Sequence, residues 1–366
     1  MSIEDNTDKN KTMHRLSQMG WTSFFQAQLE PFANDGVMPA RVVGVSKNSF
    51  RTSDGNRERL ATLAGRLNHN ADDLYPVTGD WVLMTDAVIS KVLVRENALS
   101  RGASGTHHKQ EAQPQKEQVI AANLDTVFIV CGLDRDFNLR RIERYLTLVY
   151  NCGLTPVILL TKADLHQDPE PFVGDVEAVA FGVPIHLVSA SDDSGLKALA
   201  PYLSPGRTTT MVGSSGAGKS TLVNRLYGSP IQLTGSISSH VGKGKHTTTS
   251  RDLIMMPQGG MVIDNPGIRE IAFWEVDKGI ETAFPEIEKL RLGCRFTNCS
   301  HTHEPGCRVL AAVDDGDISR DRLENYRKMK RELAYLADRQ HKSADRVEKE
   351  RWKEVALKIK AQKKKR

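Results

Sequence analysis

The stretch VILLTKADL, residues 157–165, places the tetrapeptide Thr161-Lys162-Ala163-Asp164 directly after a run of apolar residues. Such a run is typical of a buried strand, and the loops at the ends of parallel strands bind the ligands of open α/β sheets. The Asp164 carboxylate can accept hydrogen bonds from the N1–H and N2 amino groups of guanine, donors that adenine does not offer there. The tetrapeptide therefore predicts a guanine-reading loop, with the aliphatic stem of Lys162 lying along the base.

A second polar loop supports this interpretation. The apolar segment VPIHLVSAS reaches Ser189 and Ala190, which resemble the loop whose backbone contacts the guanine carbonyl group. Thr161 stands where asparagine is commoner, so we expect one amide contact to be weakened or replaced. The alternative is a surface loop that contains Lys and Asp by chance, which the flanking apolar runs disfavour.

The sequence GSSGAGKS, residues 213–220, has the spacing G-x-x-x-x-G-K-[S/T] of a phosphate-binding loop. An apolar run enters it and an amphipathic helical segment leaves it, so backbone N–H groups can surround phosphates at a helix N-terminus. We expect Lys219 to bind the β- and γ-phosphates as a catalytic cation, and Ser220 to bind Mg²⁺. The residues expected at the phosphates of GTP or GDP are Gly213, Ser214, Ser215, Gly216, Ala217, Gly218, Lys219, Ser220 and Thr221.

The sequence DNPG has the D-x-x-G pattern of a γ-phosphate sensor. Asp264 ends an apolar run and Gly267 follows three residues later. We expect Asp264 to hold Mg²⁺ through water and the Gly267 N–H to bind the γ-phosphate. The pattern is very common by itself, and its place after the next expected strand gives it weight.

A polar, positively charged segment, GKGKHTTTS at 242–250, lies between these motifs and suits a loop that closes over Mg²⁺ and the γ-phosphate. Of its consecutive threonines we favour Thr248, then Thr247, as the magnesium ligand. Ile268 stands where many GTPases carry a glutamine that orients the attacking water. His246 is the internal candidate for that catalytic role, and the alternative is an exposed or structural histidine.

The order of the motifs is unusual, because the guanine-reading loop precedes the phosphate loop. From residue 119 to 273, apolar runs alternate with helical segments, which indicates a parallel sheet covered by helices on both faces. Joining the termini of a GTPase domain and cutting it elsewhere would leave the strand ends beside one another. The order therefore predicts a circularly permuted α/β P-loop GTPase domain.

The stretch CRFTNCSHTHEPGC carries a candidate metal centre. Cys294, Cys299, His301 and Cys307 offer three thiolates and one imidazole, the composition of a closed, structural zinc site. His303 is close enough to compete with His301, and the pattern alone does not separate them. The alternative, ordinary buried cysteines, is disfavoured by the surrounding Asn, Ser, Gly and Pro residues.

Composition limits the remaining possibilities. Apolar residues make up 39% of the 366 residues and charged residues 26%, which is ordinary for a globular protein. No stretch approaches the roughly 18 continuous apolar residues of a membrane helix, and the start of the chain has no apolar signal core. We therefore expect a cytoplasmic protein without a membrane partner.

The ends of the chain differ from its centre. Short β-like runs between 37 and 104 suggest a small barrel of the OB type, although periodicity does not exclude an SH3-like one. The segment 339–366 contains 12 Lys/Arg and 4 Asp/Glu, and it is either a solvated helix or a tail that seeks nucleic-acid phosphates. The expected segments are 1–36 (N-terminal extension), 37–104 (OB-type barrel), 105–118 (linker), 119–273 (permuted GTPase domain), 274–338 (helical zinc-binding domain) and 339–366 (basic tail).

This ordered series of motifs resembles the RsgA (YjeQ/YloQ) family of circularly permuted GTPases of small ribosomal subunit biogenesis. The resemblance covers roughly residues 37–335, and it implies an OB fold, a permuted GTPase domain and a zinc domain with His301 as the family's ligand. It also implies late maturation of the 30S subunit, contact with its rRNA, and slow GTP hydrolysis that the subunit stimulates. We expect such a factor to be a monomer with GTP or GDP, Mg²⁺ and one structural Zn²⁺ as its cofactors.

Three other functions remain open from the sequence. Ile268 would suit an RNA-binding module whose nucleotide site only senses GTP or GDP. A P-loop ATPase is the second alternative, against which Asp164 argues. A large-subunit assembly GTPase of the permuted class is the third, and the cysteine cluster argues against it.

Overall fold

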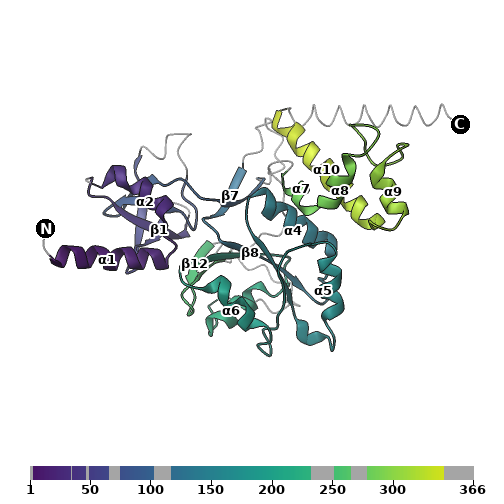
Figure 1. Ribbon diagram of the computed structural model, residues 1–366. Coiled ribbons are helices and arrows are strands. Elements are labelled where there is room, and N and C mark those ends of the chain that lie inside the picture. Colours follow the sequence, from purple (N-terminus) through teal and green to yellow (C-terminus); the bar gives the residue numbers. More distant parts are fainter. Residues whose placement is uncertain are drawn as a thin grey trace, which may run out of the picture. The chain divides into compact units, whose positions relative to one another are not determined.

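The computed structural model describes residues 3–33, 35–46, 49–65, 75–102, 117–231, 251–264 and 278–341. Two compact units share these residues, one comprising 1–99 with 119–270 and the other 100–118 with 271–366. Figure 1 labels their elements. Among the described residues, no helix has the length and apolar character needed to cross a membrane.

A five-stranded barrel opens the first unit. Its strands are β1 (Met38–Val45), β2 (Phe50–Ser53), β3 (Glu58–Leu63), β4 (Trp81–Thr85) and β5 (Val88–Val92). The strand order is β1-β2-β3-β5-β4, and β4 pairs back with β1, so the sheet closes on itself. The β3–β5 pair is parallel, which a simple up-and-down barrel would not contain. This topology confirms the OB-type barrel.

The barrel interior follows from alternation along the strands. Ala40 and Val42 of β1 point inward with Phe50 of β2 and Val82 of β4, and all are buried. Helices α1 (Ile3–Gln18) and α2 (Ser23–Leu29) and the short 3₁₀ helix η1 (Glu30–Phe32) precede the barrel. The ring of Trp21 lies 4.8 Å from that of Trp81 in an edge-to-face contact, so this first part of the chain packs on the barrel.

The GTPase sheet lies in the same unit. Its strands are β8 (Thr126–Gly132), β9 (Pro156–Thr161), β10 (Ile185–Leu187), β11 (Thr208–Val212), β12 (Arg251–Met255) and β13 (Met261–Asp264). They are ordered β10-β9-β8-β11-β13-β12, and all neighbours are parallel except β12 with β13. Strand β11, which enters the phosphate loop, is therefore flanked by an earlier strand, β8, and a later one, β13. That interleaving confirms the circular permutation expected from the motif order.

Helices cover this sheet on both faces, as Figure 1 shows for α4 and α6. The helices of the region are α4 (Leu139–Asn151), α5 (Glu170–Glu177) and α6 (Lys219–Tyr227), with the 3₁₀ helices η2 (Ala163–Leu165) and η3 (Leu196–Leu203). Phe128 and Val130 of β8 share one buried cluster with Leu222 of α6 and Leu199 of η3. Helix η3 contains Pro201, a residue that has no N–H for an α-helical bond.

Strand β12 joins the barrel to the GTPase sheet. It pairs antiparallel with β13 on one side and with β1 on the other, where Gly44 lies opposite Asp252. Apolar periodicity does not reveal this strand, because only Leu253 of its five residues is buried. The two sheets form one continuous hydrogen-bonded ladder of eleven strands.

Arg41 lies at the same junction and is 1% exposed. Its guanidinium donates to the carbonyl oxygens of Gly79 and Asn123 at 3.1 and 3.0 Å, to the hydroxyl of Thr208 at 2.9 Å, and to the carbonyl of Met19. Burial lowers the pKa of Arg41 to about 10, so the side chain is still charged at neutral pH. A single buried cation thus holds α1's end, the barrel and the phosphate-loop strand together.

The second unit is mainly helical. Its helices are α7 (Lys278–Ala283), α8 (Pro285–Arg291), α9 (Arg308–Asp314) and α10 (Arg320–His341). Ile280, Ile287 and Leu323 of these helices are buried, as is Phe284 between α7 and α8. Strands β6 (Ala98–Gly102) and β7 (Glu117–Ala122) form a separate two-stranded sheet, and β7 begins inside the expected linker, at residue 117. The division of the chain into six segments stays a prediction.

Candidate nucleotide site and metal centre

The phosphate loop follows β11 and ends at the first turn of α6. Gly213 has φ +153°, and a Cβ there would lie 2.3 Å from the Val130 carbonyl oxygen, so only glycine allows β11 this close to β8. The Lys219 Nζ donates to the carbonyl oxygens of Gly213 and Ser214 at 2.7 and 2.6 Å. The ammonium group therefore lies over the loop, where phosphate oxygens can accept from it. Ser220 and Thr221 follow it in α6.

Thr161 connects the guanine-reading loop to the phosphate loop. Its hydroxyl donates to the Ala217 carbonyl oxygen at 2.6 Å, and its side chain is buried. The hydroxyl thus bonds to the phosphate loop from the position where asparagine is commoner.

Lys162 has a left-handed backbone conformation, with φ +61°. Its Nζ donates to the Gly216 carbonyl oxygen at 2.7 Å and to Asp134 Oδ2 at 2.6 Å. The hydrogen bond from Lys162 lowers the pKa of the Asp134 carboxyl below its usual range. The lysine is therefore held between the phosphate loop and a carboxylate on the turn after β8.

Asp164 is exposed and lies beside the buried Ser189. The Ser189 hydroxyl donates to Asp164 Oδ1 at 2.6 Å, and a further bond from Ser191 acts on the same carboxyl. Together these hydrogen bonds hold the pKa of Asp164 below its ordinary value, so the carboxylate is ionised and faces solvent. Ala190 is half-buried at the end of the same loop. The structure thus brings the two expected guanine loops together.

Asp264 lies at the carboxyl end of β13. Because Ile263 pairs with Thr210 of β11 in parallel register, the strand end falls next to the start of the phosphate loop. The other expected members of the γ-phosphate and magnesium site lie outside the described residues. These are His246, Thr247, Thr248, Gly267 and Ile268, and their roles stay predictions.

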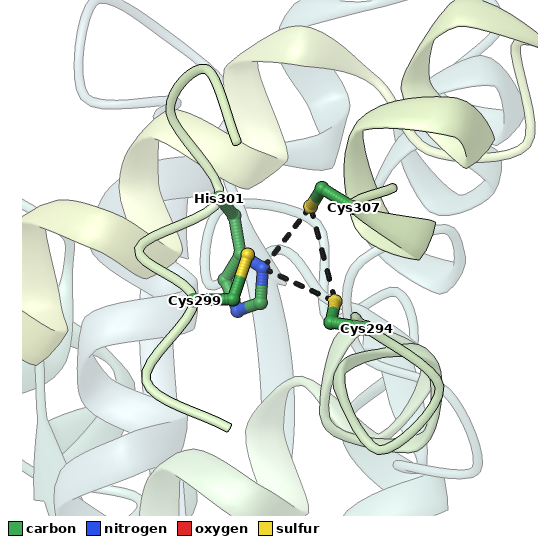
Figure 2. A group of neighbouring side chains, drawn as sticks. All are labelled: Cys294, Cys299, His301 and Cys307. Carbon is green, nitrogen blue, oxygen red and sulfur yellow. Dashed lines mark hydrogen bonds between the residues drawn. The ribbon is translucent and has the colours of Figure 1, made fainter. Parts of the chain in front are cut away.

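The candidate metal centre brings four side chains to one point. The ligand atoms of Cys294, Cys299, His301 and Cys307 all lie within 4.8 Å of one another (Figure 2). His301 Nδ1 lies 3.3 Å from Cys307 Sγ and 3.7 Å from Cys294 Sγ, and these two sulfur atoms are 3.9 Å apart. Tetrahedral bonds of about 2.3 Å to sulfur and 2.0 Å to nitrogen would place such atoms about 3.5 to 3.8 Å apart. The four groups therefore fit a single Zn²⁺.

The structure also separates the two histidines. His301 is buried, with its Nδ1 among the sulfur atoms, whereas His303 is exposed and its Nδ1 lies 2.9 Å from the Thr302 hydroxyl. Glu304 holds the turn between them, accepting from the backbone N–H groups of Ser300, Thr302 and His303 at 2.9, 2.8 and 3.1 Å. This turn presents His301, and not His303, to the cysteines.

Sequence reasoning missed the turn after β8, residues 132–137. Asp136 accepts hydrogen bonds from the Ser214 hydroxyl of the phosphate loop and from Arg141, and Asp134 accepts one from Lys162. A signal was available, because GLDRDF places two carboxylates directly after a buried strand. Their partners became evident only from the strand order.

Known proteins are similar to this chain along most of its length. A family model described as RsgA GTPase matches residues 92–274. A small ribosomal subunit biogenesis GTPase RsgA from Opitutus terrae is 43% identical over 357 residues, which cover 93% of this chain and 95% of that relative. The chain belongs to the RsgA GTPase family. A further RsgA from Methanosarcina acetivorans is 46% identical, covering 78% of this chain and 77% of its own.

Solved structures agree with membership of the RsgA family. The crystal structure of YjeQ from Thermotoga maritima matches with a TM-score of 0.58 and 29% identity, covering 81% of this chain and 99% of its own. A second family model, described as 50S ribosome-binding GTPase, matches residues 208–346. Together with the phosphate loop, membership of the RsgA GTPase family identifies the chain as an enzyme that hydrolyses GTP. The ATPase and purely sensory alternatives are therefore set aside.

Proposed function

We propose that this chain binds the 30S ribosomal subunit through its rRNA, assists late maturation of that subunit, and hydrolyses GTP slowly until the subunit stimulates it. The observation that carries the proposal is similarity to small ribosomal subunit biogenesis GTPases along almost the whole chain, 93% of it for one relative. It acts as a monomer in the cytoplasm, with the OB-type barrel and the zinc-binding helical domain as its RNA-contacting parts.

The site residues have distinct roles in this proposal. Asp164 and Lys162 select guanine, aided by Thr161 and by the backbone of Ser189 and Ala190. Residues 213–221 hold the phosphates of GTP or GDP, and Gly267 senses the γ-phosphate. Ser220, Thr248 and, through water, Asp264 hold Mg²⁺, which neutralises charge on the phosphates when bound. His246 orients the attacking water in place of the glutamine that Ile268 replaces.

The zinc ligands have a structural role. Three thiolates and one imidazole leave no open coordination position, so zinc closes the loop between α8 and α9 and takes no part in GTP hydrolysis. Zinc in this position stabilises a helical unit that has a small core of its own.

The test is the GTPase rate measured against increasing concentrations of separated 30S and 50S subunits. We expect a slow intrinsic rate, a rise with 30S subunits only, and loss of both in Lys219→Ala. The ribosomal proposal fails if neither subunit changes the rate.

A large-subunit factor is the second candidate, because one matching family model is described as 50S ribosome-binding. That match begins at residue 208 and leaves out β8, β9 and β10, whereas the RsgA model includes them. Co-sedimentation with 50S and not with 30S subunits, in the presence of a non-hydrolysable GTP analogue, would favour this candidate.

A further inference from the structure

The turn after β8 stands between the two loops of the nucleotide site. Strand β8 lies between β9, which leads to the guanine-reading loop, and β11, which leads to the phosphate loop. All three strands are parallel, so their carboxyl ends meet at one edge of the sheet. The turn at 132–137 therefore has one of these loops on each side.

Asp134 contacts the guanine-reading side. Its Oδ2 accepts from Lys162 Nζ at 2.6 Å, while the same Nζ donates to the Gly216 carbonyl oxygen at 2.7 Å. The lysine stem passes close to the backbone of the turn, since a Cβ on Gly132 would lie 3.5 Å from its Cδ and Cε atoms. The stem is thereby fixed at its charged end and supported along its length.

Asp136 contacts the phosphate side. Its carboxylate accepts from the Ser214 hydroxyl and from Arg141, and Oδ2 also accepts from the Gly132 N–H at 3.3 Å. The two acidic residues belong to one turn, because the Asp136 N–H donates to Asp134 Oδ1 at 3.0 Å. Displacement of either carboxylate would therefore also move the other.

These carboxylates are close to a site for an anionic ligand, and their charge needs compensation. Lys162 pairs with Asp134 and Arg141 pairs with Asp136. Each pair is partly exposed, with about a third of the Lys162 and Asp134 side chains accessible. The pairs are thus worth little as stabilising ion pairs, and positioning is the effect that their geometry supports.

We propose that Asp134 is a positioning residue for guanine recognition. It orients the Lys162 stem along the base, and Asp136 fixes the position of the turn against the phosphate loop. This inference rests on the proposed function, specifically on the roles given to Lys162 and Asp164.

The test measures the affinity of the full-length chain for fluorescent N-methylanthraniloyl GDP and its ADP counterpart. We expect Asp134→Asn to weaken GDP binding by about 2- to 5-fold, a loss of the size of one partly exposed charged contact. ADP binding should change less, because adenine offers Asp164 no donors that would hold the base against the lysine stem. Asp134→Glu keeps the charge and should lie closer to the unaltered protein. The exposed Asp175 on α5 provides the matched control, Asp175→Asn.

A double-mutant cycle separates positioning from general destabilisation. In a Lys162→Met background, Asp134→Asn should weaken GDP binding by less than about 1.5-fold, because its target is gone. Equal losses in both backgrounds, or no loss in Asp134→Asn alone, would overturn the proposal. Asp164→Asn identifies which idea has failed. If it too leaves the GDP-to-ADP preference unchanged, the guanine assignment itself is wrong; if it abolishes the preference, only the role of Asp134 is lost.

Discussion

Replacing Arg41 by methionine tests whether the buried guanidinium stabilises the junction of barrel and GTPase sheet. The side chain is 1% exposed and donates to three carbonyl oxygens and one hydroxyl. Methionine replaces the aliphatic stem of arginine but has no hydrogen-bond donor. The Gly79 carbonyl keeps a partner, since the Asn123 side-chain amide donates to it at 3.0 Å. The carbonyl oxygens of Met19 and Asn123 lose the guanidinium as their hydrogen-bond donor.

The expected cost follows from these contacts. Two carbonyl groups that lose a buried partner cost about 1–3 kcal/mol each. Part of this loss is offset, because methionine removes the free-energy cost of burying a cation. That desolvation is also the effect that lowers the pKa of Arg41 to about 10. We expect a net loss of about 2–4 kcal/mol in the free energy of unfolding of the first unit.

Equilibrium unfolding in urea measures this loss, and Arg51→Met is its matched control. Arg51 of β2 contacts Asp252 of β12 at 2.6 Å across the same junction, but its side chain is 44% exposed. We expect its replacement to cost less than about 1 kcal/mol. The Arg41→Met loss should also be constant between about pH 6 and pH 8, where the guanidinium stays charged. An unchanged or increased stability of Arg41→Met would refute the reasoning, because desolvation would then outweigh the hydrogen bonds.

Three further predictions concern the sites. Thr161→Val removes the hydroxyl bond to the phosphate loop and should weaken GDP binding by about 5- to 50-fold in a fluorescence titration, with Thr161→Ser as the control that retains it. Ser189→Ala should raise the pKa of Asp164, which the native hydrogen bonds hold below its ordinary value. Since the ionised carboxylate accepts from guanine, GDP binding should be lost as pH falls through that pKa, and at a higher pH in Ser189→Ala than in the native chain; coincident titrations would contradict this. His301→Ala should lose bound zinc and lower the melting temperature of the helical unit, whereas His303→Ala should retain one zinc per chain by elemental analysis.

Much of the nucleotide site could be predicted from the sequence because its chemistry is local. The phosphate loop needs glycines at fixed spacing, and the guanine-reading loop follows an uninterrupted apolar strand. Both properties are visible in eight or nine consecutive residues. The alternation of strands and helices further predicts a parallel sheet, and hence the meeting of these loops at one edge.

Other features depend on contacts between distant residues. In the sequence, Arg41 is a single charged residue within an expected strand. Its burial becomes evident only from its hydrogen bonds to Gly79, Asn123 and Thr208. Strand β12 has one buried residue among five, so periodicity cannot reveal it. The choice between His301 and His303 depends on the turn that Glu304 holds. For Arg41 and β12 the deciding information is the position of another chain segment, whereas the choice of histidine depends on a local turn geometry that ligand spacing does not reveal.

Permutation has a physical consequence for the γ-phosphate side of the site. Strand β12 follows the segment 242–250 and pairs with β1 of the barrel, while β13 ends at Asp264 and the chain then continues through 265–277 to α7. Both strands next to the expected γ-phosphate sensors are therefore connected to other parts of the protein, one by backbone hydrogen bonds and one by the chain itself. In an unpermuted order, β13 would be followed by further strands of the same sheet. Placing the expected sensors last in the GTPase domain therefore connects them to each part that is proposed to contact RNA, to the barrel by the β12–β1 pairing and to the helical unit along the chain.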